Sequence, residues 1–258
     1  MSIPLFDHHV HLDDERTPAE FIQSGLDDPR LVGAVSAGYG PERSDRARAW
    51  LARDARLSRT VGLHPWWLAH HSAAEIDAAW SEVEREAQEP GVVALGEMGL
   101  DQLTRKKLPL DAQRAHFERA LAACQRLQTS AVLHVVRWPG HALEILRATP
   151  PPGGVLHRYG GPGDMIPLFQ ALGLHISVDT TRWRQRPEQV AEIVRRADPE
   201  LLLAETDWPL KPHPWSEALD ELEQLVHFIA ECRGEPRLRV AERLVDNARK
   251  LYGVSVTQ

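Results

Sequence analysis

The N-terminal stretch of the chain holds residue types that bind metal ions. His9 and His11 are two positions apart, and they follow a short apolar run, residues 3–6, that predicts a buried strand. Alternate side chains of a strand point the same way, so both imidazoles are expected on one face, with Asp7 on that face and His8 on the other. Two imidazoles at a strand end make half of a metal site. The stretch would equally fit a histidine-rich surface turn, so the rest of the chain decides between the two interpretations.

Further residues of ligand type stand at the ends of other predicted strands. They are His64, Glu97, His134, His157 and Asp207. Each of them taken singly fits a capping group or a satisfied polar group of the core. Together with the first two histidines, however, they form a set of seven at six strand ends. Such regularity favours one shared site over seven unrelated caps.

The size of this set indicates which chemistry the site could perform. Four histidines and two carboxylates exceed what one ion with open positions uses: His9, His11, Glu97, His134, His157 and Asp207. They suit two divalent ions about 3.5–4 Å apart, with a bridging carboxylate and a bridging hydroxide. Such a pair activates water at neutral pH and neutralises a phosphoryl or carbonyl oxygen. The predicted chemistry is hydrolysis, since no paired serine or cysteine nucleophile and no phosphate-binding glycine loop stands in the sequence.

The elements that would position these residues are short apolar runs alternating with helical patterns. The predicted strands are 3–6, 31–36, 60–63, 92–95, 131–135, 154–156, 174–178 and 201–204. The predicted helices are 43–56, 73–89, 111–128, 140–148, 163–172, 187–197, 216–232 and 237–251. This alternation predicts a single domain, 1–258, folded as a (β/α)8 TIM barrel with its site at the C-terminal ends of the strands. An open doubly wound sheet is the alternative, but no glycine-rich dinucleotide turn supports it.

Composition narrows the class of protein further. The 258 residues carry a formal net charge of -7, which argues against broad electrostatic coating of nucleic acid. It leaves room for a local basic groove around metal ions. The two cysteines fit buried thiols of a reducing compartment. No segment reads as a signal peptide or a membrane span, so we expect a cytoplasmic protein without a membrane partner.

Five motifs, in order along nearly the whole chain, resemble one known family. Residues 7–13 resemble D-x-H-x-H-L-D, residues 62–65 G-x-H-P, and residues 96–101 G-E-I-G-L-D, the most specific of the set. Residues 205–209 resemble E-T-D-x-P, and residues 247–253 resemble N-x-x-x-L-F-G. The sequence is therefore similar to the TatD family of metal-dependent deoxyribonucleases, which are amidohydrolase-like TIM barrels.

The resemblance implies a role for each site residue. The metal ligands would be His9, His11, Glu97, His134, His157 and Asp207. Glu97 would bridge two ions, and Asp207 would also orient or deprotonate the attacking water, so both count as catalytic. His64 would contact the scissile phosphate and no metal. Asp7 and Asp101 are expected to orient ligands without touching an ion. The ions would be Mg2+, Mn2+ or Zn2+.

The chain departs from the family pattern where substrate would bind. The family's H-x-F-S-G reads as residues 157–161 here, with Gly160 in place of the serine and Arg158 gained. Its H-x-R after the fifth strand is one residue longer here and ends at Arg137. A longer N-x-P loop of many relatives is missing after Asp207. The choice of substrate is therefore less firmly predicted than metal binding.

Tryptophans and basic residues share the predicted strand-to-helix loops. Six tryptophans lie there: Trp66, Trp67, Trp138, Trp183, Trp208 and Trp215. Basic residues interleave with them: Arg105, Lys106, Lys107, Arg137, Arg158, Arg182, Arg184, Arg186 and Lys211. Core packing fits each tryptophan as well as substrate contact does. Because bases stack on such side chains, we expect a basic, aromatic mouth. Its substrate contacts are predicted at His64, Arg137, Arg158, Trp66 and Trp208.

These observations lead to one predicted function and two alternatives. The predicted function is a phosphodiesterase that trims single-stranded or frayed 3′ ends of DNA. The first alternative keeps the metals but hydrolyses small esters, lactones or amides, in which case a narrow closed pocket is expected. The second is a catalytically weakened barrel that serves as a subunit of a larger complex.

Overall fold

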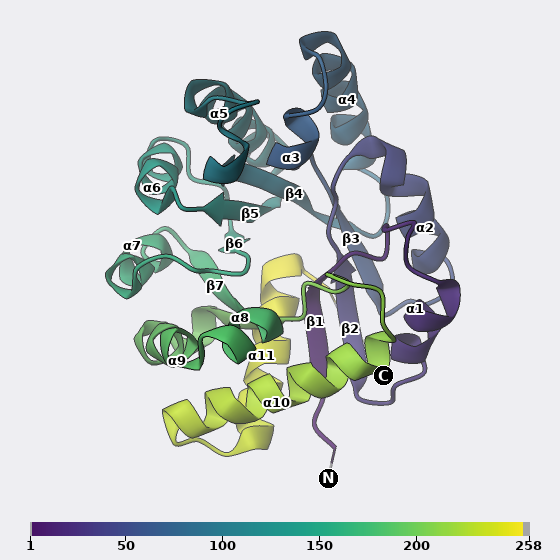
Figure 1. Cartoon of the computed structure of the whole chain (residues 1–258), viewed down its shortest axis with the longest axis vertical. Coiled ribbons are helices and arrows are strands. Elements are labelled where there is room, and N and C mark those ends of the chain that lie inside the picture. Colours follow the sequence, from purple (N-terminus) through teal and green to yellow (C-terminus); the bar gives the residue numbers. More distant parts are fainter. Residues whose placement is uncertain (1, 255–258) are drawn as a thin grey trace.

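Eight parallel strands form one sheet, in the order in which they occur along the chain. They are β1 (Leu5–Val10), β2 (Leu31–Ser36), β3 (Leu57–Val61), β4 (Val92–Asp101), β5 (Ser130–Val136), β6 (Gly154–Leu156), β7 (Leu174–Asp179) and β8 (Leu202–Glu205). The structure is a computed structural model that describes residues 2–254. Figure 1 shows the strands as a ring with helices around its outside. The predicted (β/α)8 TIM barrel is confirmed.

The helices fill the spaces between the strands. They are α1 (Ala19–Leu26), α2 (Ser44–Leu51), α3 (Pro65–Leu68), α4 (Ala73–Glu86), α5 (Leu110–Leu127), α6 (Pro139–Ala148), α7 (Ile166–Gln170), α8 (Thr180–Gln185), α9 (Pro187–Arg196), α10 (Trp215–Arg233) and α11 (Arg237–Tyr252). The part of the chain that the structure describes also contains four short 3-10 helices: η1 (Pro41–Arg43), η2 (Gln102–Thr104), η3 (Gly163–Met165) and η4 (Pro199–Leu201). Among residues 2–254, no helix combines the length and the apolar character needed to cross a membrane.

Several element boundaries differ from those predicted. β1 begins at Leu5 and ends at Val10, so His8 and His9 lie within the strand and only His11 follows it. Helices α1, α3 and α8 were not predicted, because runs of four to eight residues are too short to show a helical period. The predicted domain range includes residue 1 and residues 255–258, which lie outside the described residues. A single domain over the full range stays a prediction.

The barrel is closed between β8 and β1 by hydrogen bonds just beyond the end of β8. The Asp207 backbone N–H donates to the His9 carbonyl at 3.1 Å, and the His11 N–H donates to the Trp208 carbonyl at 2.6 Å. These two bonds fix the ends of the first and the last strand against each other. Two ligand-type segments, separated by about 200 residues in sequence, are thereby placed side by side.

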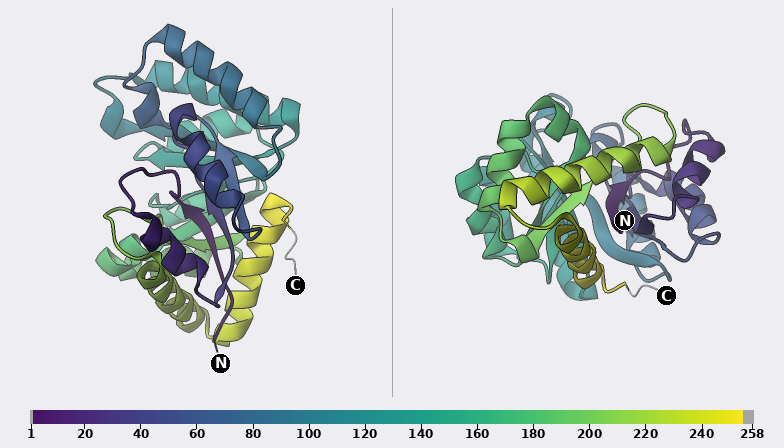
Figure 2. Two further views of the ribbon diagram at one scale, coloured as in Figure 1. Left: turned by 90° about the vertical axis from the view of Figure 1, so that its right-hand side faces the viewer. Right: turned by 90° about the horizontal axis from the view of Figure 1, so that it is seen from below.

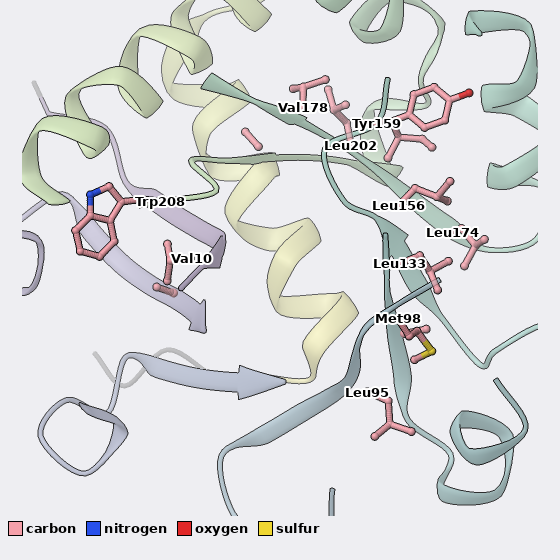
Figure 3. Packing of buried hydrophobic residues seen from close by; sticks show 14 of the residues in the cluster. Val10, Leu95, Met98, Leu133, Leu156, Tyr159, Leu174, Val178, Leu202 and Trp208 are labelled. Atoms are coloured by element: carbon pink, nitrogen blue, oxygen red, sulfur yellow. The ribbon is translucent and has the colours of Figure 1, made fainter. Parts of the chain in front are cut away.

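Two apolar layers support the barrel. The larger core lies between the sheet and the surrounding helices, and Figure 3 shows side chains from β1 and from β4 to β8 gathered in it. The smaller core includes Phe6 of β1, Leu203 of β8 and Tyr252 of α11. Residues of α11 share this cluster with residues of six strands, and the helix itself contacts β1 and β8. Phe6 and Leu203 stand near the starts of their strands, so α11 lies towards the end opposite to the strands' C-termini (Figure 2). The C-terminal ends remain open for a site.

Candidate metal centre

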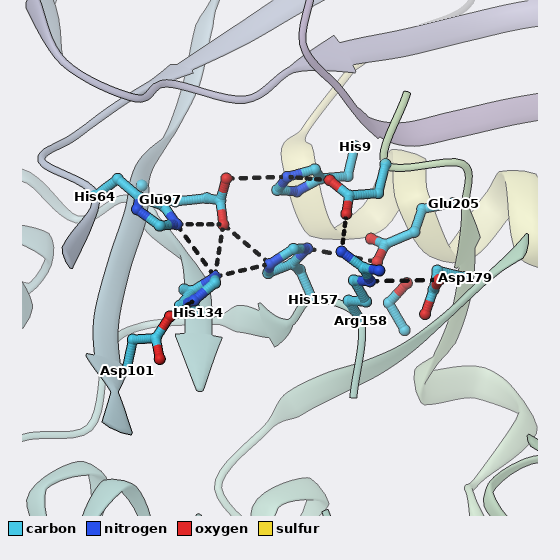
Figure 4. A network of polar contacts seen from close by, with 12 residues as sticks. His9, His64, Glu97, Asp101, His134, His157, Arg158, Asp179 and Glu205 are labelled. Atoms are coloured by element: carbon cyan, nitrogen blue, oxygen red, sulfur yellow. Dashed lines mark hydrogen bonds and ion pairs between the residues drawn. The ribbon is translucent and has the colours of Figure 1, made fainter. Parts of the chain in front are cut away.

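Glu97, near the middle of β4, is surrounded by imidazole nitrogens. His157 Nε2 lies 2.9 Å from its Oε1 and His134 Nδ1 lies 3.1 Å from the same oxygen. On the other side, His9 Nε2 lies 3.2 Å from Oε2 and His11 Nε2 3.6 Å. The carboxylate is 2 % exposed, and Figure 4 shows the side chains converging on it. Glu97 is therefore the centre of the cluster that the sequence predicted.

Asp207, which follows β8, joins the cluster on the β1 side. Its Oδ1 lies 3.5 Å from His11 Nε2 and 3.9 Å from His9 Nε2. Its Oδ2 accepts a hydrogen bond from Arg158 Nη1 at 2.5 Å. The six predicted ligands thus converge in one place, although they come from β1, β4, β5, β6 and β8.

Three of the histidines are held from behind by a second carboxylate. His134 Nε2 is 3.2 Å from Asp101 Oδ2, and His157 Nδ1 is 3.4 Å from Glu205 Oε1. His11 Nδ1 is 3.5 Å from Asp13 Oδ1. Each ring therefore turns one nitrogen towards a carboxylate behind it and the other towards the centre. This is the arrangement by which proteins fix the tautomer and orientation of metal-binding histidines.

The charges of the cluster stabilise ionised carboxylates. Burial alone would raise the pKa of Glu97, but the positive charge of His157 and His9 holds that pKa well below its usual range. Burial likewise opposes ionisation of Asp207, whose pKa is nevertheless lowered by His11 and by the Arg158 guanidinium. Both groups are therefore anionic at neutral pH, as metal binding requires.

His64 differs from the other histidines because its Nδ1 is already used. This residue is the N-cap of α3, and its Nδ1 accepts a hydrogen bond from the Trp66 backbone N–H at 3.0 Å. Burial lowers its pKa to about 3, so the ring is neutral at pH 7. A neutral ring whose Nδ1 accepts must carry its proton on Nε2. That Nε2, 3.6 Å from Glu97 Oε1, is therefore a hydrogen-bond donor.

The arrangement of donor atoms fits divalent metal ions. Within residues 2–254, three groups have ligand atoms close enough to share an ion: His9 with His11 and Asp207, His64 with Glu97 and His134, and His9 with His157 and Glu205. His134 Nδ1 lies only 3.2 Å from His157 Nε2, so the two nitrogens face each other across a small gap. Nitrogen and carboxylate donors held this close are stabilised by a cation such as Zn2+ or Mn2+.

Asp7 and His8 lie on the opposite faces of β1 from those that the sequence predicted. Asp7 points to the helix layer, where its carboxylate accepts hydrogen bonds from the Thr206 N–H at 3.0 Å and the Trp215 indole at 3.2 Å. Asp7 therefore holds the backbone next to Asp207. His8 lies inside the barrel. The pairing of β1 with β2 shifts between Asp7 and Val10, which breaks the simple alternation.

Sequence reasoning missed a polar layer beneath the centre. His8 Nε2 lies 2.6 Å from Glu205 Oε2 and 2.6 Å from Ser177 Oγ, and its Nδ1 lies 3.3 Å from the Tyr252 hydroxyl. His8 and Glu205 are almost fully buried. The sequence offered one signal for these two residues, namely their position within the quoted motifs. His8 stands beside His9, and Glu205 stands two residues before Asp207.

The predicted aromatic mouth is wrong for most of its members. Trp208 is 1 % exposed and stacks on Trp215, so it has no surface left for substrate. Trp67 is also buried, while Trp138 and Trp183 pack against the main core. Trp66 alone among the six is exposed, at 46 %, and its indole donates to Asp101 Oδ2 at 2.6 Å. The other five tryptophan side chains are wholly or partly covered by neighbouring residues.

An open cleft of about 620 Å3 leads to the centre. Its lining includes His134 and His157 at the base, and Trp66, Arg137 and Arg158 higher up. Arg137, Arg158 and Asp207 have positive φ angles of 63°, 48° and 55°. Residues other than glycine rarely adopt this backbone conformation. Such backbone strain gathers at functional sites. Four of the five predicted substrate contacts, His64 included, therefore lie in or beside the site.

Comparison with known proteins identifies the family. A model of the family described as TatD related DNase matches residues 6–253. The chain belongs to this family. It is 32 % identical over 209 residues to the 3′-5′ ssDNA/RNA exonuclease TatD of Rahnella sp. (strain Y9602), covering 76 % of this chain and 77 % of the relative. It is 31 % identical to the protein of the same name from Pantoea vagans (strain C9-1), covering 87 % and 89 %.

Solved structures show the same fold for this TatD-related protein. The crystal structure of YjjV, a TatD homologue from Escherichia coli K12, superposes with a TM-score of 0.84 at 24 % identity. It covers 97 % of this chain and 98 % of the other. The predicted family is confirmed, and with it the predicted class of enzyme, a metal-dependent hydrolase acting on ester bonds.

Proposed function

We propose that this TatD-related hydrolase is a nuclease that trims single-stranded or frayed 3′ ends of DNA with two divalent ions. The observation that carries the proposal is the orientation of the histidines. His11, His134 and His157 each direct one nitrogen at the central carboxylates and the other at a carboxylate behind. This preorganised centre lies at the base of an open cleft that contains arginine side chains.

Two groups of ligands would hold the ions. His9, His11 and Asp207 form the first, and His134 with His157 the second, while Glu97 lies between them and would bridge. Divalent ions in such a site increase the acidity of water and neutralise charge on a phosphoryl oxygen. Zn2+, Mn2+ and Mg2+ remain the candidates, and elemental analysis of the purified protein would establish both number and identity.

Asp207 is suited to accept the proton of the attacking water. It is 5 % exposed, and its low pKa keeps it ionised at neutral pH. The hydrogen bond from Arg158 fixes its Oδ2, so the free direction of Oδ1 points towards His9 and His11. A carboxylate held in this way is positioned before substrate arrives, as general-base catalysis requires.

His64 is suited to donate to the phosphate. Its proton is on Nε2, which faces the centre, because Nδ1 accepts from the Trp66 N–H. A protonated nitrogen offers no lone pair to a metal ion but forms a hydrogen bond with a phosphoryl oxygen. This agrees with the predicted role of His64 as a substrate contact.

The two alternatives have less support. The cleft is open and basic, which suits a polyanion better than a small neutral ester, lactone or amide. The names of the Rahnella and Pantoea relatives point to single-stranded DNA and RNA. A weakened barrel within a larger complex would not need all six ligands, yet all six converge on one centre.

The test is hydrolysis of end-labelled single-stranded DNA. Shortening from the 3′ end is expected with Mn2+ or Mg2+ and is expected to stop with chelator. Glu97→Gln and Asp207→Asn should each reduce the rate roughly 10²–10⁴-fold, as loss of an acid–base group does. Glu144→Gln, on the exposed side of α6, is the control and should leave the rate unchanged. Metal-loaded protein that shortens no DNA would refute the proposal.

A further inference from the structure

Arginine side chains line the cleft. Four arginines are in its lining: Arg137, Arg158, Arg182 and Arg186. Asp101 is the one carboxylate among the lining residues, and Trp66 and His134 already occupy its Oδ2. The cleft is therefore strongly positive on a chain whose net charge is -7.

Buried carboxylates compensate only the two inner arginines. Arg158 binds Asp207 at 2.5 Å, and its Nε lies 3.4 Å from Asp179 Oδ1. Arg182 Nε lies 3.5 Å from Asp179 Oδ2, and its Nη2 donates to the Arg158 carbonyl at 3.3 Å. Asp179 itself is fully buried at the end of β7. One carboxylate is thus shared by two guanidinium groups.

The two outer arginines carry charge without a protein partner. Within residues 2–254, neither Arg137 nor Arg186 forms a side-chain ion pair or hydrogen bond, and both are exposed at the cleft. Burial lowers the pKa of Arg182, and the like charges of Arg158 and Arg186 lower it further. Like charges held together at an open cleft favour binding of an anion.

A glycine makes room for the inner arginine. A Cβ built on Gly160 would lie 2.3 Å from Arg182 Nη1, which no real contact tolerates. The guanidinium therefore lies directly against the backbone of the loop after β6. Gln189 of α9 binds the Gly160 carbonyl at 3.3 Å and holds the loop in place. A side chain at position 160 would require the Arg182 guanidinium to move.

We propose that Arg182 and Arg186, together with Arg137, bind a second phosphate of the substrate, next to the one that is hydrolysed. This assignment of a substrate class rests on the proposed nuclease function. The substrate class is then an oligonucleotide with at least two phosphates, and small monoesters are poor substrates. Guanidinium groups suit this role because their planar donors match phosphate oxygens.

Two measurements test the subsite independently of each other. The first is calorimetric titration of inorganic pyrophosphate into the full-length, metal-free protein, which needs no hydrolysis. Arg186→Gln and Arg182→Gln should each weaken binding about tenfold, as loss of one charge-assisted contact does. Gly160→Ser should act like Arg182→Gln. Arg184→Gln is the matched control, because Arg184 lies on the same helix but pairs with Glu221 at 2.7 Å outside the cleft.

The second measurement uses thymidine trinucleotides with metal-loaded protein. Replacing one of the two linkages by a neutral methylphosphonate removes a single charge. Both positional isomers, one for each linkage, are tested. Cleavage of the remaining linkage should slow about tenfold in the wild type in at least one isomer. The Arg186→Gln protein, which remains folded because this side chain is exposed, should show no such discrimination.

Each outcome decides one claim. Pyrophosphate binding that is equal in the wild type, Arg182→Gln and Arg186→Gln overturns the subsite, even if DNA is hydrolysed. Equal weakening by Arg184→Gln also overturns it, since general electrostatics would then explain the effect. Arginine-dependent pyrophosphate binding without any DNA hydrolysis supports the subsite and refutes the proposed nuclease function.

Discussion

At the scale of single residues, the centre depends on carboxylates that touch no predicted ion. Asp13, Asp101 and Glu205 each lie behind one histidine and leave its other nitrogen facing inwards. Glu205 is the most deeply buried of the three, and His8 holds it from below at 2.6 Å. We expect it to fix the ring of His157, because a ring that rotates freely binds metal more weakly.

Glu205→Gln is expected to weaken metal binding about 10–100-fold, since it removes the charge behind His157. Calorimetric metal titration of the full-length protein measures this. Ring nitrogen NMR should show that His157 loses its single tautomer. Tyr252→Phe is the control, because it removes only a 3.3 Å contact to His8 Nδ1. Unchanged metal affinity in Glu205→Gln would show that the carboxylate does not position the ring.

At the scale of elements, α11 holds the start of β8. Asn247 is fully buried in this helix, and its Nδ2 donates to the Pro199 carbonyl at 2.8 Å and to the Leu202 carbonyl at 2.9 Å. β8 leads directly into Glu205 and Asp207. The last helix therefore supports the metal centre from the opposite end of the barrel, through one strand.

Asn247→Leu leaves two carbonyl acceptors without this donor, so we expect the free energy of unfolding to fall by about 2–4 kcal/mol. Denaturant unfolding followed by circular dichroism measures the change. The neighbouring Asp246→Ala is the control, since Asp246 is exposed and pairs with Arg249 at 3.3 Å on the helix surface. If both variants lose the same stability, the buried hydrogen bonds of Asn247 are not what anchors β8.

At the scale of the whole molecule, the barrel gathers ligand-type groups that are far apart in the sequence. Glu97, Asp207 and Glu205 are buried within one cluster, and imidazole nitrogens 3.2 Å apart face each other among them. A bound ion would stabilise the folded state alone, because the unfolded chain does not bring the ligands together. Metal binding should therefore stabilise the entire fold.

Adding Mn2+ or Zn2+ at about 100 times its dissociation constant should stabilise the fold by about 2.7 kcal/mol. For a domain of this size that raises the melting temperature by roughly 5–10 °C. Differential scanning fluorimetry with and without chelator measures the shift. Glu97→Gln should lose most of it. An equal shift in both proteins would place the stabilising ion outside the predicted centre.

The sequence by itself determined the fold class and the membership of the metal centre. Eight apolar runs predicted the barrel, and ligand-type residues at their ends predicted that His9, Glu97, His157 and Asp207 would meet. Both predictions depend on patterns that are local in sequence, namely hydrophobic period and residue type at a strand end. A closed barrel then brings all strand ends together, whatever the details of its loops.

Only the tertiary structure decided where individual side chains point and what covers them. The register shift in β1 turned His8 into the barrel and Asp7 out of it, against the simple alternation. The neighbouring α10 buried Trp208 under Trp215, and Gly160 admitted Arg182 to the cleft. These outcomes depend on register and on contacts between residues far apart in the chain. A single sequence contains no local signal for either, because strand pairing and packing are set when the elements assemble.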